Sequence, residues 1–196
     1  RALQFGDGIY EVLLAIDGVP LLAEEHLDRW EISAAGLSMS ARFTREQRLQ
    51  VIHELARRLG ARRAAIYGQL SRGTARRGHQ FPVKPQPTEI WYAREIAPKP
   101  MNWYTEGVMA VTHPDDRWKH VWIKSTCLLP NCMAKTYAAE RGAFDSILVA
   151  EDGIVTESSA GNVFAVKDGV VFTHPANGRI LPGVTRSLVI KLAKAQ

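Results

Sequence analysis

Lys124 is the residue of this 196-residue sequence whose position most suggests chemistry. It follows the apolar residues Trp122 and Ile123, which look like the end of a strand, and a helix is predicted a few residues later. Side chains at such a junction are often buried or lie at the mouth of a cleft. Most lysines there are solvated charges, but a desolvated lysine has the lowered pKa that Schiff-base chemistry needs. Position alone suggests a nucleophilic amine without establishing one.

Two other segments hold groups that suit a charged organic cofactor. Glu157 is the single acid among small residues in 155–164, between two predicted strands. A turn explains most of this pattern, but a confined carboxylate can also pair with a protonated ring nitrogen. Residues 181–186 form a turn with Gly183 that opens a predicted helix. The exposed amides of a helix start suit a phosphate, although a simply capped helix also explains the segment.

Signals for other chemistries are missing from the sequence. It contains no glycine-rich nucleotide motif, no P-loop, no Gly-x-Ser-x-Gly elbow and no pair of histidines at metal-ligand spacing. Cys127 and Cys132 do not form a zinc pattern, so we expect two reduced thiols and no metal.

The net charge of +5 comes from 25 basic and 20 acidic side chains, and arginines between residues 57 and 77 supply much of the excess. We find no nucleic-acid-reading motif and no aromatics interleaved with this cluster, so solvated helix charge and attraction of acidic small molecules explain it better. No apolar run reaches the ~18 residues that cross a bilayer, and the first residues do not resemble a secretory signal. We therefore expect a soluble, cytoplasmic protein without nucleic-acid or membrane partners.

The first half of the sequence predicts a small α/β domain over residues 1–98. A hairpin is expected over 9–22 around the turn dipeptide Asp17-Gly18, followed by a helix over 24–39. Thr44 and Gln47 make a capping box for a second helix that ends at Gly60. Residues 64–70 and 89–96 are predicted strands, joined by a long loop over 71–87 that we expect to be functional.

A linker with two prolines over residues 97–102 separates this part from a larger domain over 99–196. The elements expected there are strands over 108–112, 120–123, 146–151, 153–156, 162–166 and 170–173, and a helix over 129–141. Asp152-Gly153 and Asp168-Gly169 predict hairpin turns. Helices and strands do not alternate as in a doubly wound sheet, so the predicted fold class is α+β with a sheet built from hairpins.

Short segments along nearly the whole chain resemble, in order, the fold-type IV enzymes that depend on pyridoxal 5'-phosphate. This class includes D-amino-acid aminotransferases, branched-chain aminotransferases and aminodeoxychorismate lyases. The matching segments are residues 4–12, 25–29, 71–73, 77–82, 123–125 with 128–129, 156–157, 162–164 and 173–177. The resemblance implies the two-domain fold-type IV architecture, with a small N-terminal α/β domain and a larger domain with a sheet or barrel.

The resemblance also implies roles for individual residues. Lys124 would hold the cofactor as a Schiff base and move the proton between the substrate α-carbon and the cofactor. Glu157 would lie against the pyridine nitrogen and keep it protonated. Arg29, the amide of Val184, and the amide and hydroxyl of Thr185 would bind the 5'-phosphate.

Within this class, the chain most resembles the D-amino-acid aminotransferases. Tyr10, Arg77 and His79 match their trap for the substrate carboxylate, in which the arginine and histidine come from the partner subunit of a dimer. Branched-chain enzymes have Asn-Tyr where this chain has Leu128-Leu129. We therefore expect a homodimer that transfers amino groups between D-amino acids and 2-oxo acids.

Several alternatives share the same resemblance. The nearest are a branched-chain or (R)-amine transaminase and an aminodeoxychorismate-lyase-like enzyme, and a non-catalytic protein that binds pyridoxal phosphate is the alternative outside enzymes. The chain opens on Arg1 without a methionine and stops inside an amphipathic run that starts at Thr185. We therefore expect a fragment that lacks the first strand and the C-terminal part of the fold.

Overall fold

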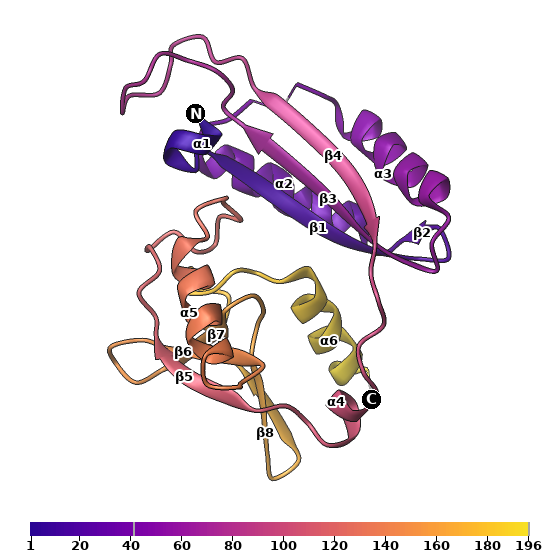
Figure 1. Cartoon of the computed structure of the whole chain (residues 1–196), viewed down its shortest axis with the longest axis vertical. Helices are drawn as coiled ribbons and strands as arrows, with labels where there is room; N and C mark the ends of the chain where they lie inside the picture. The colour runs from indigo at the N-terminus through magenta and orange to yellow at the C-terminus, as the bar shows by residue number, and fades with distance from the viewer. Residues whose placement is uncertain (41, 196) are drawn as a thin grey trace. The chain divides into compact units, whose positions relative to one another are not determined.

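Two compact units make up the chain (Figure 1) in the computed structural model, which describes residues 1–40 and 42–195. Unit 1 comprises Arg1–Pro98 with Ile123–Cys127, and unit 2 comprises Lys99–Trp122 with Leu128–Gln196, whose last residue lies outside the described part. The units differ in one place from the predicted halves, because the segment with Lys124 groups with unit 1. The amide of Thr126, for example, donates to the carbonyl of Gly8 at 3.0 Å.

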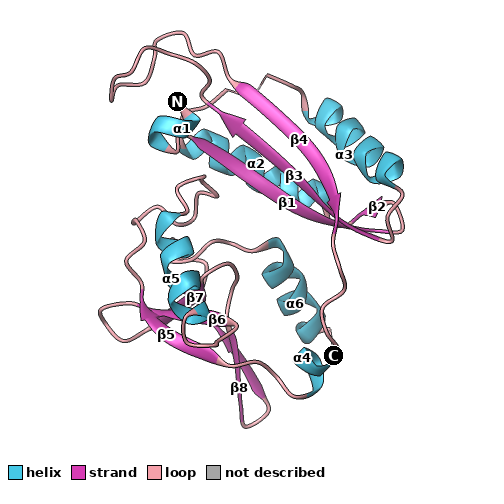
Figure 2. Ribbon diagram, viewed as in Figure 1, coloured by secondary structure: helices cyan, strands magenta, loops and turns pink. Residues whose placement is uncertain are grey.

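Unit 1 is a four-stranded antiparallel sheet with the order β2-β1-β3-β4 and two long helices (Figure 2). Its elements are α1 (Ala2–Phe5), β1 (Gly8–Ile16), β2 (Val19–Pro20), α2 (Ala23–Gly36), α3 (Arg45–Leu59), β3 (Arg63–Ser71) and β4 (Thr88–Glu95). The predicted hairpin is confirmed, with Asp17 and Gly18 at φ 48° and 77°. The capping box is also confirmed, since the amide of Gln47 donates to the Thr44 hydroxyl at 3.2 Å and the amide of Thr44 to the Gln47 side chain at 2.9 Å.

The two faces of this sheet differ because side chains alternate along each strand. Leu13 and Ile66 point into the core, where they pack with Leu27 of α2 and Ile52 of α3. The opposite face carries tyrosines and exposed aliphatic side chains, namely Tyr10, Val12, Tyr67, Ile90 and Tyr92. One face is therefore closed by helices, and the other presents an apolar and aromatic surface.

Unit 2 contains a three-stranded sheet and a separate hairpin. Its elements are α4 (Asn102–Thr105), β5 (Ala110–Pro114), α5 (Leu129–Ala139), β6 (Asp145–Val149), β7 (Val155–Ser158), β8 (Phe164–Lys167), β9 (Val170–Thr173) and α6 (Val184–Lys194). The predicted turns at Asp152-Gly153 and Asp168-Gly169 are confirmed. One pair departs from the expected hairpins, because β5 and β6 run parallel and α5 lies between them in the chain.

The strand predicted over residues 120–123 is wrong. These residues form turns, and beyond them Ser125 makes one isolated bridge to Ile9. The apolar run imitates a strand because Val121, Trp122 and Ile123 favour extended structure, but it has no continuous partner strand in the described chain. In residues 1–40 and 42–195, no helix is both long and apolar enough to cross a membrane.

Candidate functional site

Lys124 lies in a segment that unit 1 holds from two sides. Its amide donates a hydrogen bond to the hydroxyl of Ser33 in α2 at 3.1 Å. Its carbonyl accepts one from the amide of Tyr10 in β1 at 3.0 Å. The backbone of the lysine is thus fixed by a helix and by a strand, so its side chain starts from a defined position even though the predicted strand is absent.

A buried carboxylate, Glu11, organises the basic residues of α2 beside this segment. Glu11 occupies a core-facing position of β1 and is fully buried. Its two carboxylate oxygens accept from Nε and Nη2 of Arg29, each at 2.7 Å, and His26 Nδ1 lies 2.8 Å from Oε2. His26 and Arg29 are three residues apart and therefore lie on the same face of the helix. The two-pronged pair fixes the orientation of the Arg29 guanidinium.

The charge of Glu11 is maintained by these partners. Burial by itself would raise the pKa of Glu11, but the hydrogen bonds from Arg29 and His26 and the charges of Arg29 and Lys124 hold this pKa below its ordinary value.

Tyr10 begins a row of stacked rings across the open face of the sheet. The ring centroids of Tyr10 and Tyr67 are 5.7 Å apart, and those of Tyr67 and Tyr92 are 5.1 Å apart. Lys124 Nζ lies 4.2 Å from the centroid of the Tyr10 ring. The structure therefore brings together Lys124 and Tyr10, two of the residues selected from the sequence, in a contact between a cation and an aromatic ring.

Glu157 is the centre of a second polar cluster, in unit 2. One carboxylate oxygen, Oε2, pairs with Arg117 and accepts from the amide of Leu181 at 3.1 Å. The other, Oε1, accepts from Nδ2 of Asn162 at 2.8 Å. The side chain is nearly inaccessible to solvent, and burial raises the pKa of Glu157 despite the opposing effect of Arg117.

Arg117 also pairs with a second acid, Asp115, at 2.8 Å, and the Asp115 side chain is 10% exposed. Burial would raise the pKa of Asp115, but Arg117 and the hydroxyl of Thr156 lower it further than burial raises it. One arginine thus serves two carboxylates, which leaves a net negative charge when both are ionised. A cationic ring nitrogen matches that charge.

The other predicted residues of unit 2 lie at the start of α6. Gly183 is the N-cap residue, and Val184 and Thr185 are the first residues of this 11-residue helix. No side chain caps the helix, as a glycine occupies the cap position. Uncapped amides at a helix N-terminus favour an anion such as a phosphate.

Arg77 and His79 lie in the long loop of unit 1 and contact Phe5 of their own chain. The Arg77 guanidinium is 5.4 Å from the Phe5 ring centroid, and the His79 and Phe5 rings meet edge to face at 5.9 Å. These contacts bring Arg77 and His79 together at α1, whereas Tyr10 is grouped with Tyr67 and Lys124. Among the described residues, the members of the predicted carboxylate trap therefore form two sets: Arg77 and His79 contact Phe5, and Tyr10 contacts Tyr67 and Lys124.

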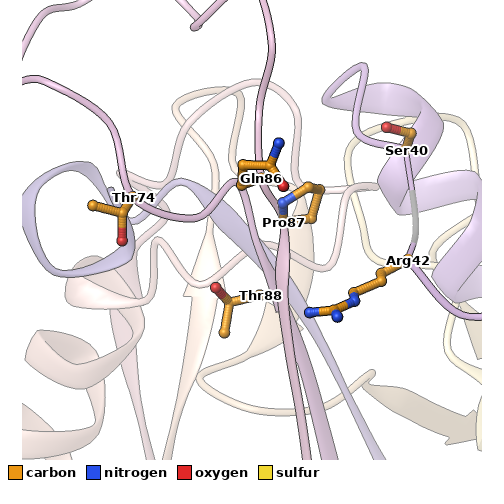
Figure 3. Close-up of a pocket in the computed structure, with 6 residues that line it drawn as sticks. All are labelled: Ser40, Arg42, Thr74, Gln86, Pro87 and Thr88. Carbon is orange, nitrogen blue, oxygen red and sulfur yellow. The ribbon is translucent and has the colours of Figure 1, made fainter.

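A polar hollow of about 460 Å³ lies at the base of the same loop (Figure 3). It is lined by Ser40, Arg42, Thr74, Gln86, Pro87 and Thr88. Most of these residues are exposed, and none was selected from the sequence. Within the described ranges, 1–40 and 42–195, no group of His, Cys, Asp and Glu side chains could hold a metal ion.

Sequence reasoning missed Glu11, Ser33, Asp115, Arg117 and Asn162 as parts of the two clusters. Glu11 could have been found, because a charged residue among core-facing apolar positions of an alternating strand requires a buried partner. Asn162 lies in a segment that carried the resemblance, but nothing in its type assigned it a partner. Arg117 is one of many arginines, and only the folded chain shows that it pairs with Glu157 and Asp115.

Nearly the whole chain matches known proteins of one family. The family model for amino-transferase class IV matches residues 8–196. A D-alanine aminotransferase of Staphylococcus epidermidis is 38% identical over 194 residues, which cover 99% of this chain and 68% of that relative. A fold IV-transaminase of Curtobacterium pusillum is 26% identical with a TM-score of 0.82, covering 99% of this chain and 68% of that one. The branched-chain aminotransferase of Escherichia coli shares the fold at 23% identity, with a TM-score of 0.89 and coverage of 99% and 67%.

Proposed function

Because this chain belongs to the class IV aminotransferases, we propose that it transfers amino groups between D-amino acids and 2-oxo acids. The observation that carries the proposal is the placement of Lys124, whose backbone is fixed by Ser33 and Tyr10 and whose amine lies over the Tyr10 ring. The D-alanine aminotransferase of Staphylococcus epidermidis, 38% identical, supports the choice of D-amino acids.

The cofactor of this family is pyridoxal 5'-phosphate, and the residues present fit it. Lys124 offers an amine for covalent attachment. Arg29 is a buried cation whose orientation Glu11 fixes, and Val184 and Thr185 stand at a helix start that no side chain caps. These groups suit a phosphate dianion. Glu157 suits the protonated ring nitrogen, because its cluster carries net negative charge when Glu157 and Asp115 are both ionised.

The bound cofactor supplies an electron sink that stabilises the substrate carbanion. The chain supplies the remaining chemistry. Lys124 Nζ would take the proton from the substrate α-carbon and pass it to the cofactor carbon that keeps the amino group, before the 2-oxo acid leaves. Glu157 would hold the ring nitrogen in its protonated form, and Arg29, Val184 and Thr185 would anchor the phosphate.

We further propose that the active form is a homodimer in which each substrate carboxylate meets Tyr10 of one chain and Arg77 and His79 of the other. The grouping of Arg77 and His79 at Phe5, apart from Tyr10, supports a shared trap. The open face of the sheet, with Val12 40% and Tyr92 47% exposed, offers an apolar surface for a second copy. The cytoplasmic location expected from the sequence is part of this proposal.

Hybrid dimers test the shared trap. We would mix Lys124→Ala with Arg77→Ala subunits under conditions in which subunit exchange is demonstrated by mass. At equal mixing the proposal predicts about a quarter of the wild-type activity, because half of the dimers are hybrids and one of their two sites is intact. No recovery would contradict the shared trap and leave the cofactor assignment untouched.

The substrate class is tested by recording turnover of D-alanine and of L-leucine, each with 2-oxoglutarate. The proposal predicts turnover of D-alanine with the cofactor absorbance retained. Preferred turnover of L-leucine would instead identify a branched-chain transaminase. Cofactor absorbance without turnover of any amino acid or of an (R)-amine would point to a lyase or to a non-catalytic protein.

A further inference from the structure

Asn162 connects the two parts of unit 2 that the proposed function assigns to opposite ends of the cofactor. Its Nδ2 donates to Oε1 of Glu157 at 2.8 Å and to the carbonyl of Leu181 at 2.9 Å. The amide of Leu181 in turn donates to Oε2 of Glu157 at 3.1 Å. Leu181 lies two residues before Gly183, the cap of α6. A closed set of hydrogen bonds thus ties the acid to the chain that enters the helix.

The amide group of Asn162 suits both of these partners. The Glu157 carboxylate and the Leu181 carbonyl are both acceptors, so the atom that faces them must carry two hydrogens, as the Asn162 NH2 group does. The other side of the amide is closed by Gly183. A Cβ at position 183 would lie 2.0 Å from Asn162 Oδ1, so the packing requires glycine at the helix cap.

We propose that Asn162 is a positioning residue that sets the Glu157 carboxylate and the N-terminus of α6 in one arrangement, and so fixes the ring end and the phosphate end of the cofactor together. This inference rests on the proposed roles of Glu157, Val184 and Thr185. Asn162 has no assigned contact with the cofactor in this proposal. It acts through Glu157 and through the backbone of Leu181.

Two substitutions at position 162 separate the loss of hydrogen bonds from a change in the charge beside Glu157. Asn162→Ala removes both donated hydrogen bonds, and a hydrogen bond to a charged partner is strong enough that we expect cofactor affinity to fall on the order of tenfold to a hundredfold. Asn162→Asp keeps the volume but places a carboxylate against Glu157. Burial already raises the pKa of Glu157, and a second negative charge raises this pKa further. Glu157 therefore becomes protonated at a higher pH than in the wild type.

The test compares Asn162→Ala and Asn162→Asp with Asn102→Asp, which adds the same charge at an exposed position of unit 2. Dissociation constants would be measured for pyridoxal 5'-phosphate and for pyridoxal, which lacks the phosphate, after the melting temperature of each apoprotein confirms folding. Both ligands should bind more weakly to the Asn162 variants, the absorbance of bound cofactor should titrate at a changed pH in Asn162→Asp, and Asn102→Asp should match the wild type.

A double-mutant cycle decides whether Asn162 acts through Glu157. The effects of Asn162→Ala and Glu157→Gln on cofactor affinity should be non-additive, with the pair losing less than the sum of the single losses. Additive effects, or Asn162 variants that bind both ligands like the wild type, overturn the positioning role. A wild-type protein that binds no cofactor overturns the proposed function instead, and a Glu157→Gln variant with unchanged affinity and spectrum overturns the proposed role of Glu157.

Discussion

The guanidinium of Arg29 and the carboxylate of Glu11 meet through two nitrogen–oxygen contacts of 2.7 Å each, with the Glu11 side chain fully buried. Each residue needs the other, because a single buried charge in this core would be uncompensated. The pair also orients Arg29, which we assign to the cofactor phosphate. One contact between β1 and α2 thus serves both stability and the proposed site.

Arg29→Ala should therefore lower the free energy of unfolding and weaken the cofactor at the same time. Loss of one partner of a buried pair costs about 3 to 5 kcal/mol. Arg45→Ala is the matched control. Arg45 begins α3 and pairs with exposed acids of α2, the helix that carries Arg29, so its loss should cost at most about 1 kcal/mol. Urea unfolding and a phosphate-cofactor binding titration measure the two effects. Equal losses in both variants would remove the special role of the buried pair.

The lowered pKa of Glu11 predicts a specific dependence of stability on pH. Because this pKa lies below the ordinary value of 4.5, ionised Glu11 stabilises the fold fully above that value, and the stabilisation is lost as the pH falls through the lowered pKa. Between about pH 5 and about pH 3, the wild type should lose more free energy of unfolding than Glu11→Gln, which has no proton to gain there. Parallel curves for the two proteins would show that Glu11 does not contribute to acid unfolding.

Glu157→Gln should reduce turnover far more than it weakens substrate binding. The substitution keeps the shape of the side chain and removes the charge assigned to the ring nitrogen, so we expect kcat to fall on the order of tenfold to a hundredfold with KM little changed. Asp152→Asn, which disrupts an exposed pair with Arg179, is the control. A raised KM with an intact kcat would mean that Glu157 stabilises the bound substrate and the transition state equally, which contradicts its role at the ring nitrogen.

Arg77→Ala should depress kcat/KM for D-alanine by roughly tenfold to a hundredfold, the effect of losing a charge-assisted hydrogen bond to the substrate carboxylate. The absorbance of the bound cofactor should stay as in the wild type. Arg76→Ala removes the neighbouring exposed arginine of the same loop and controls for the change in net charge. If both variants behave alike, Arg77 is a solvated loop residue and the preference for D-amino acids has another origin.

Local signals explain why much of the fold was predictable. Asp17-Gly18 and Asp168-Gly169 accept the positive φ angles of tight turns, and Thr44 with Gln47 provides both halves of a capping box. These patterns act over a few residues, so the sequence states them directly. The predicted helices and most predicted strands were confirmed within a few residues for the same reason.

Long-range contacts explain what the sequence could not state. The Lys124 segment is held by Ser33, 91 residues away, and not by the strand that its apolar residues suggested. Likewise, β5 pairs parallel to β6 across α5, a connection that no turn dipeptide marks. The pairing of Arg117 with Glu157 also spans 40 residues. The sequence identified residue types suited to the chemistry, but their partners depend on tertiary packing.

Covalent attachment of the cofactor at Lys124 is the central claim, and one measurement tests it most directly. The protein would be saturated with pyridoxal 5'-phosphate, reduced with borohydride, digested and mapped by mass spectrometry. The account predicts a single pyridoxyl adduct on Lys124, whose backbone Ser33 and Tyr10 hold in place. An adduct on Lys119 or Lys135 in its place, or no adduct at all, would contradict it.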